Sequence, residues 1–124
     1  MTTSSSRGSS SDFLLRASAI LKTLGHPVRL EIVKYLRYEE HSVAEIQKHL
    51  NLIQSVTSQH LRLLDRKGIV KWRPEGTTRY YSIANIFIHR ILECFTECET
   101  LIQSGDWETG RPNHQDKEER RLVP

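Results

Sequence analysis

The sequence lacks any apolar run of the roughly 18 residues that a membrane-spanning helix needs. Its first eleven residues, MTTSSSRGSSS, are polar throughout and contain no hydrophobic signal core. Cysteine is also scarce, with only Cys94 and Cys98 in 124 residues. We therefore expect a cytoplasmic protein with no membrane partner, whose cysteines are free thiols rather than a structural bridge.

Signatures of catalysis are missing as well. The sequence contains no glycine-rich phosphate loop, no nucleophile motif and no paired carboxylates that would face an obvious cleft. An enzyme is therefore not predicted.

The composition favours one small domain with an acidic partner. A hydrophobic fraction of 37% is enough for one modest core, and the formal net charge is +3. Residues 42–82 carry seven basic side chains against three acidic ones. This excess is consistent with nucleic acid but does not establish it.

The two ends of the chain differ from its middle. Residues 1–11 are rich in serine and are expected to form a disordered N-terminal arm. Asp12 is a plausible N-cap for a first helix that Gly25 ends. Residues 105–124 carry mixed charge and are expected to be a flexible C-terminal tail. The folded domain is therefore predicted to span residues 12–104.

Two further helices precede the central stretch of the chain. His26-Pro27 opens an apolar helix that is predicted to reach about Tyr38. Ser42 is followed three residues later by Glu45, which is the spacing of a capping box, so a short third helix should begin there. Asn51 suits the left-handed turn that closes it.

The stretch from residue 51 to 68 separates into two faces when it is placed on a helix. Thr57, Leu61 and Leu64 fall on one side and should be buried. The other side carries hydroxyl, amide and guanidinium groups, which can contact base edges and phosphates in the major groove of DNA. We interpret this stretch as a recognition helix; the polar side comprises Ser55, Ser58, Gln59, Arg62 and Arg66.

A hairpin is predicted directly after Gly68. Residues 69–73 and 77–82 have strand composition, and Pro74-Glu75-Gly76 between them is a turn. Arg73 and Arg79 flank its tip and could reach phosphate or the minor groove, although arginine near a hairpin tip also serves solubility. A hairpin in this position is a wing.

The last predicted helix runs from about residue 83 to 104 and is strongly apolar. It carries more apolar surface than the outside of a small monomer should expose. We expect a homodimer through the first and last helices. The fold class is therefore mostly α (α+β), a winged helix-turn-helix.

These segments together resemble the ArsR/SmtB family of small winged-helix bacterial repressors. The similarity lies in LKTLGHPVRLEIVKYL at 21–36, VAEIQKHLNL at 43–52, QSVTSQHLRLLDRKGIV at 54–70 and RPEGTTRYYSI at 73–83. The resemblance implies a homodimer with five helices and a hairpin between the fourth and fifth. It also implies binding to an imperfect palindrome in double-stranded DNA and release by an inducer.

The resemblance assigns DNA contacts residue by residue. On the recognition helix they would be Gln54, Ser55, Ser58, Gln59 and Arg62, and on the wing Arg73 and Arg79. One departure is Ile53, where the family often has a serine or threonine cap; its absence could weaken the helix start by about 1 kcal/mol.

The metal sites of the family are not reproduced. Many relatives bind a soft metal or arsenite through a Cys-Val-Cys motif at the third helix, where this chain has Ser42 and Ala44. Others use an Asp-x-His with a later His-x-x-Glu on the last helix, where this chain has His89 alone. We predict no metal site of either kind and no cofactor.

Cys94 and Cys98 lie four residues apart on one face of the last helix. Side chains at that spacing are about 5–6 Å apart at Cβ, whereas a disulfide needs about 3.5–4.5 Å. A bridge between subunits, or two thiolates on a thiophilic ion, fits the spacing better. The alternative is that both are small packing residues. Nearby Glu93, Glu97 and Glu99 should raise the thiol pKa.

We therefore predict a sequence-specific DNA-binding transcriptional repressor of the ArsR type, which binds a palindromic operator as a dimer. An inducer would release it, and the candidates are thiol oxidation and a thiophilic ion at Cys94 and Cys98. The alternatives are a winged-helix protein-interaction module and an ArsR-like regulator without metal or redox sensing.

Overall fold

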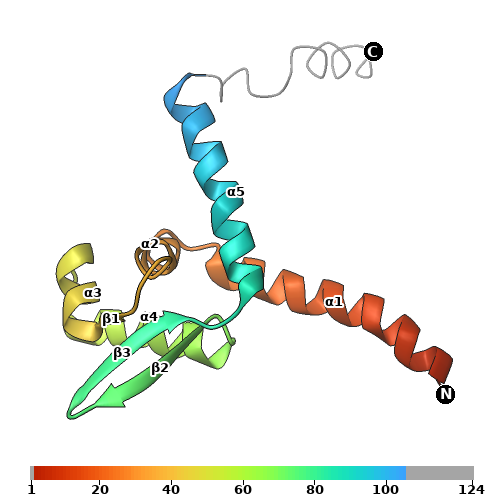
Figure 1. Ribbon diagram of the computed structural model, residues 1–124, viewed down its shortest axis with the longest axis horizontal. Helices are drawn as coiled ribbons and strands as arrows, with labels where there is room; N and C mark the ends of the chain where they lie inside the picture. Colours follow the sequence, from red (N-terminus) through yellow and green to blue (C-terminus); the bar gives the residue numbers. More distant parts are fainter. Residues whose placement is uncertain (1, 106–124) are drawn as a thin grey trace. The chain divides into compact units, whose positions relative to one another are not determined.

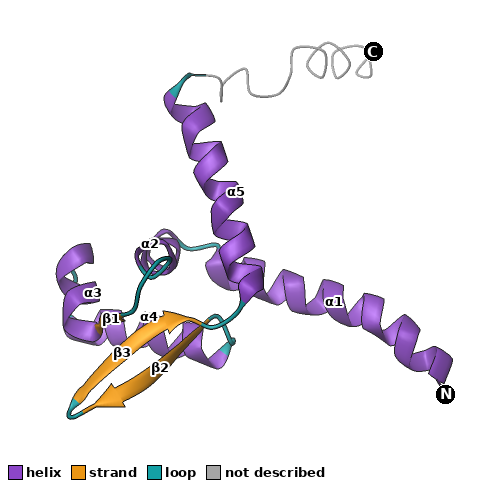
Figure 2. Cartoon of the chain, viewed as in Figure 1, coloured by secondary structure: helices purple, strands orange, loops and turns teal. Residues whose placement is uncertain are grey.

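The computed structural model describes residues 2–105, with side chains from residue 11 onward. Five helices and a small sheet follow one another along the chain (Figures 1 and 2). The helices are α1 (Thr2–Leu24), α2 (Pro27–Tyr35), α3 (Val43–Leu50), α4 (Gln54–Arg66) and α5 (Ile86–Gln103), and the strands are β1 (His41–Ser42), β2 (Val70–Glu75) and β3 (Thr78–Ile83). The mostly helical fold with a wing is confirmed.

The chain divides after His89 into two compact units. The first contains α1 to α4, the sheet and the start of α5, and the second contains the rest of α5. The boundary between the units lies within α5, a long helix that forms its backbone hydrogen bonds within itself, and the domain expected over residues 12–104 stays a prediction. From residue 106 the expected C-terminal tail lies outside the described residues.

The first helix begins earlier than the sequence predicts. α1 starts at Thr2, not at Asp12, so the segment expected as a disordered arm is helical from Thr2 onward. Adding residues to an existing helix avoids the cost of nucleation, which allows a serine-rich segment with modest propensity to join it. The helix ends at Leu24, directly before Gly25, as predicted.

The helix boundaries in the middle of the chain follow local capping chemistry. Ser42 Oγ accepts a hydrogen bond from the Glu45 amide at 3.1 Å, and Glu45 Oε1 accepts one from the Ser42 amide at 3.0 Å. The predicted capping box therefore starts α3. Asn51 closes it in the left-handed conformation, with φ 57°. α2 ends at Tyr35, before the predicted Tyr38.

The wing is part of a three-stranded antiparallel sheet in the order β1-β3-β2. β2 and β3 form the predicted hairpin, with Trp72 opposite Tyr81. The turn is Gly76-Thr77 and not the predicted Pro74-Glu75-Gly76, because Pro74 and Glu75 continue β2 and pair with β3. Strand β1 was not predicted: His41 and Ser42 pair with Tyr81 and Tyr80 of β3. This pairing attaches the wing to the residue that caps α3.

The core of the first unit is aliphatic. Burial of each large aliphatic side chain stabilises the folded state by roughly 1.5–3 kcal/mol relative to leaving that side chain exposed. These side chains include Ile32 from α2, Ile46 from α3, Leu61 and Leu64 from α4, and Ile69 before the wing, all at most 1% exposed. Among the described residues, none of the helices is both long and apolar enough to cross a membrane.

Candidate nucleic-acid interface

The two predicted faces of α4 are present. Thr57, Leu61 and Leu64 are buried, whereas Gln54, Ser55 and Gln59 are exposed. Ser58 is half-buried and Arg62 is exposed. α4 therefore presents its hydroxyl, amide and guanidinium groups away from the core, as the periodicity indicates.

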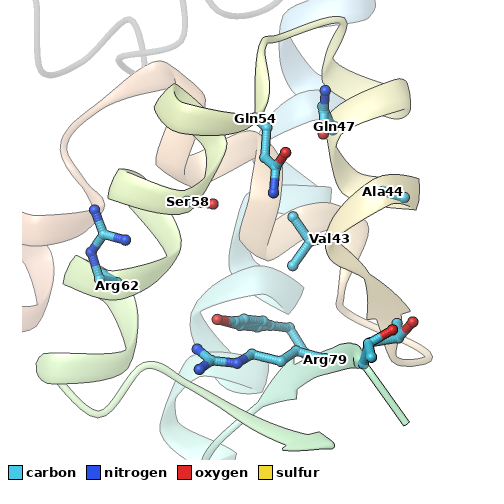
Figure 3. A pocket seen from close by; sticks show the side chains of 10 residues that line it. Val43, Ala44, Gln47, Gln54, Ser58, Arg62 and Arg79 are labelled. Atoms are coloured by element: carbon cyan, nitrogen blue, oxygen red, sulfur yellow. The ribbon is translucent and has the colours of Figure 1, made fainter. Parts of the chain in front are cut away.

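A groove of about 400 Å³ lies between α3, α4 and the wing (Figure 3). α4 contributes Gln54, Ser58 and Arg62 to its wall, and β3 contributes Arg79. These are four of the seven residues predicted to contact DNA, and the fold brings them together although they lie on two elements. Ser55 and Gln59 are exposed on α4 but do not line the groove.

Other groove residues were not predicted as site residues. Val43, Ala44 and Gln47 come from α3, and Thr77, Thr78 and Tyr81 come from the wing. The helix-turn-helix pattern was the available signal for Gln47, because α3 packs beside α4 in that motif. The threonines follow the wing turn, where a polar side chain carries no periodicity to identify it.

Two arginines face this groove from different elements. Arg62 comes from α4, and Arg79 from β3, where its guanidinium carbon lies 4.0 Å from the centre of the Trp72 ring. Among the described residues, neither arginine forms an ion pair. Both charges therefore remain available to an anion, and stacking on an aromatic ring leaves the donors of Arg79 exposed.

Arg73 lies on β2 of the wing and is paired with two carboxylates. Its Nη2 lies 2.6 Å from Glu40 Oε2, and its Nη1 lies 3.1 Å from Glu75 Oε1. Hydrogen bonding to Glu40 and then to Glu75 raises the pKa of Arg73, and the same bond to Arg73 lowers the pKa of Glu40. Arg73 does not line the groove. It joins β2 to the segment before β1.

Aromatic stacking fixes α3 against α2. The Tyr35 ring lies between the rings of His41 and His49, with both centroid distances 3.9 Å. Each imidazole also contacts a carboxylate. His41 Nδ1 lies 3.1 Å from Glu45 Oε1, and His49 Nε2 lies 3.4 Å from Glu31 Oε2. This stack sets the position of α3, and so one wall of the groove.

A second contact fixes α4 against α2. The rings of His60 on α4 and His26 lie 4.8 Å apart, and His26 Nδ1 accepts a hydrogen bond from the Val28 amide at the start of α2. Partial burial, followed by the proximity of His26 and Arg29, lowers the pKa of His60. His60 is thus a packing residue, and its lowered pKa favours the neutral form.

Cys94 and Cys98 both lie in the second unit, on α5. Cys94 is exposed and Cys98 is half-buried. Partial burial, the neighbouring Cys94 thiol and Glu97 together raise the pKa of Cys98. The expected influence of glutamate is present but comes after burial and Cys94. In the part of the chain that the structure describes, no three His, Cys, Asp or Glu side chains are grouped to hold a metal ion.

Comparison with known proteins places these features in context. The family described as "bacterial regulatory protein, arsR family" matches residues 26–71. The transcriptional activator HlyU of Vibrio cholerae is 36% identical over 78 residues, which cover 63% of this chain and 72% of HlyU. The transcriptional repressor PagR of Bacillus anthracis is 39% identical over 75 residues, covering 60% and 75% of the two chains.

Solved structures show the same architecture. Reduced HlyU from Vibrio cholerae has a TM-score of 0.69 at 31% identity, covering 73% of this chain and 96% of that one. A homodimeric winged helix-turn-helix DNA-binding domain from Mycobacterium bovis, described as a possible ArsR-family transcriptional regulator, has a TM-score of 0.69 at 25% identity. It covers 77% of this chain, which spans 89% of that one.

Proposed function

Because the chain belongs to the ArsR family of DNA-binding transcriptional regulators, we propose that it is a repressor that binds a palindromic operator as a homodimer. The observation that carries this proposal is the groove in which Arg62 of α4 and Arg79 of the wing face the polar side chains of α4. Its named relatives are transcriptional regulators, which are not enzymes.

The residues predicted to contact DNA would have two roles. Arg62 and Arg79 would contact phosphates, which supplies the salt-dependent part of the affinity. Gln54, Ser55, Ser58 and Gln59 would contact base edges, since amides and hydroxyls match their donors and acceptors. Arg73 would contact phosphate only if its ion pairs with Glu40 and Glu75 were broken. Its contribution to DNA affinity should therefore be the smallest of the three arginines.

The first helix supports a dimer. Phe13, Leu14, Leu15 and Leu21 of α1 are each more than half exposed. The Phe13 ring also meets that of Phe87 edge-on, with 6.2 Å between centroids, so the start of α5 adjoins this apolar surface. A second copy of the chain would cover it, and the Mycobacterium bovis domain is a homodimer. Two copies would present α4 to two half-sites of one palindrome.

Repression follows from where such a dimer binds. An operator that overlaps a promoter is closed to the polymerase while the dimer occupies it. The relatives include both an activator and a repressor. Whether this protein represses or activates transcription is therefore tested directly. Deleting the gene should raise expression of the promoters to which the protein binds, measured with a transcriptional fusion; lower expression would make it an activator.

The salt dependence of binding tests the phosphate contacts. Operators are selected from random duplexes, and affinity is measured from about 50 to about 200 mM salt. Replacing Arg62 with alanine removes one phosphate contact per subunit. The slope of log K against log salt should therefore become shallower by about 0.9 per contact, or about 1.8 for the dimer.

Arg90→Ala is the matched control, because Arg90 is exposed on α5 and pairs with Glu93 at 3.7 Å. Its slope should equal that of the wild type. A wild-type affinity that does not change with salt would contradict DNA binding and favour a winged-helix module that binds protein.

The inducer is proposed to act at Cys94 and Cys98. Two thiols would lose two electrons and two protons to an oxidant and form a bridge between subunits, or their thiolates would hold a thiophilic ion such as arsenite. HlyU, a relative with the same fold, has been solved in a form described as reduced. The high pKa of Cys98 predicts slow reaction at neutral pH.

The thiol sensor is tested on the DNA complex. Treatment with diamide or arsenite should release the wild type from its operator. Cys94→Ser and Cys98→Ser should bind DNA normally but resist release, measured by fluorescence anisotropy of a labelled duplex. Equal release of the wild type and both variants would reject the sensor and leave the two cysteines as packing residues.

A further inference from the structure

Ile53 is an apolar side chain at the entrance to α4, where a polar one would be more stabilising. It is the N-cap of α4, and it is 65% exposed. An N-cap serine, threonine, asparagine or aspartate would accept a hydrogen bond from the first turn of the helix. Isoleucine cannot, and α4 has no side-chain cap. The chain therefore has an exposed aliphatic side chain at a position where α4 would gain stability from a capping side chain.

The backbone at this position is nevertheless firmly held. The Ile53 carbonyl accepts hydrogen bonds from both the amide and the hydroxyl of Thr57, each at 3.1 Å. Thr57 is fully buried, and the preceding Leu52 amide donates to the Gln47 carbonyl at 3.1 Å. A β-branched side chain on a fixed backbone has few rotamers, so the Ile53 methyl groups occupy a defined place.

The next residue in the chain lines the groove, although Ile53 itself does not. Ile53 directly precedes Gln54, which lines the groove with Ser58 and Arg62 of the same helix (Figure 3). In the major groove the only apolar group that a base presents is the C5 methyl of thymine. An aliphatic side chain at the N-terminal end of a recognition helix should therefore favour thymine over the other bases.

We propose that Ile53 is a specificity-determining residue that contacts the C5 methyl of a thymine in each half-site of the operator. This rests on the proposed function and adds a base preference to it. Burying one methyl-sized group changes affinity by about fourfold, so both half-sites together give about fifteenfold.

Deoxyuridine tests this contact, because it differs from thymidine only by the missing methyl and pairs with adenine in the same way. Each thymine of the selected operator is replaced in turn, symmetrically in both half-sites, and bound by the full chain. The affinity of the wild type should fall about fifteenfold when one symmetric pair of thymines is replaced, and it should change little when any other pair is replaced. Ile53→Ser should bind the thymidine and deoxyuridine duplexes equally.

Two variants separate the methyl contact from general loss of affinity. Ile53→Val keeps an aliphatic group and should keep the preference for thymine. Gln59→Ala should weaken binding to both duplexes by the same factor and so keep the ratio. The Ile53→Ser helix gains a capping hydroxyl, so its melting temperature should not fall.

The outcomes distinguish the two proposals. If the wild type binds its operator but tolerates deoxyuridine at every position, or if Ile53→Ser keeps the preference, the Ile53 contact is overturned while DNA binding stands. If the wild type selects no duplex from the random pool, the proposed function fails and the contact fails with it.

Discussion

At the scale of single residues, His60 links the packing of α4 to pH. Its pKa is lowered from the ordinary 6.5, chiefly by burial and then by His26 and Arg29. In the pH range between the folded and unfolded pKa values, the unfolded chain binds more protons, so the folded state loses stability as the pH falls below 6.5. We expect the free energy of unfolding to decrease there, measured by urea titration at a series of pH values.

His60→Gln is the comparison for this prediction. Glutamine does not titrate, so the variant should lose less stability than the wild type between about pH 7.5 and about pH 5. The carboxylates of Glu40 and Glu45 have pKa values lowered from 4.5, and their contribution is lost only at more acidic pH. Identical pH profiles for the wild type and His60→Gln would show that His60 stays equally accessible to protons in both states.

Some residues could be assigned from the sequence because their roles are local. Ser42 and Glu45 form a capping box at a fixed spacing, and Asn51 tolerates a positive φ. Arg73 was predicted to contact DNA because it lies near the tip of the wing. Its ion pair with Glu40 could not be predicted, because the two residues are 33 positions apart and no local pattern joins them. Ion pairs between distant segments depend on the tertiary fold.

At the scale of elements, the wing depends on its turn. Gly76 has φ 64°, and a Cβ there would meet no atom within 4 Å, so conformational strain alone opposes a side chain. Gly76→Ala should lower the free energy of unfolding by about 1–2 kcal/mol, measured by urea titration. It should also weaken operator binding, because Thr77, Thr78 and Arg79 follow the turn along the groove.

Gly25→Ala is the matched control for the turn. Gly25 lies outside the left-handed region, and a Cβ there would lie 3.4 Å from the carbonyl oxygens of Leu21 and Lys22, in van der Waals contact. It should change the free energy of unfolding by only a few tenths of a kcal/mol and leave DNA affinity intact. Equal losses in both variants would contradict the assigned strain at Gly76.

The elements themselves were predictable where periodicity or capping is strong. α3, α4 and the hairpin follow from apolar spacing, the capping box and glycine. β1 has two residues, too few for any period, and exists because β3 offers it a partner. The extension of α1 to Thr2 was missed because serine-rich composition favours disorder only when no adjoining helix is present.

At the scale of the whole molecule, the exposed apolar side chains of α1 allow the proposed dimer to be tested. Leu14 is 65% exposed in the single chain, and a second copy would bury it. Leu14→Asp places a charge in that interface, which is costly without a partner. The variant should sediment as a single subunit at concentrations where the wild type sediments as a dimer, and it should bind the full operator more weakly.

Tyr38→Asp controls for a charge on an exposed apolar site. Tyr38 is 82% exposed and follows α2, so it is not part of α1. This variant should remain dimeric. Sedimentation of the wild type as a single subunit at micromolar concentrations would contradict dimerisation through α1.

The hydrogen bonds that Thr57 donates to the Ile53 carbonyl make the start of α4 independent of the side chain at position 53. Because the buried threonine, and not the side chain at 53, anchors the first turn of α4, that side chain can be exchanged without altering the helix. Under the proposed thymine contact, a single substitution at position 53 would therefore change which operators are bound and leave the backbone at the start of α4 in place.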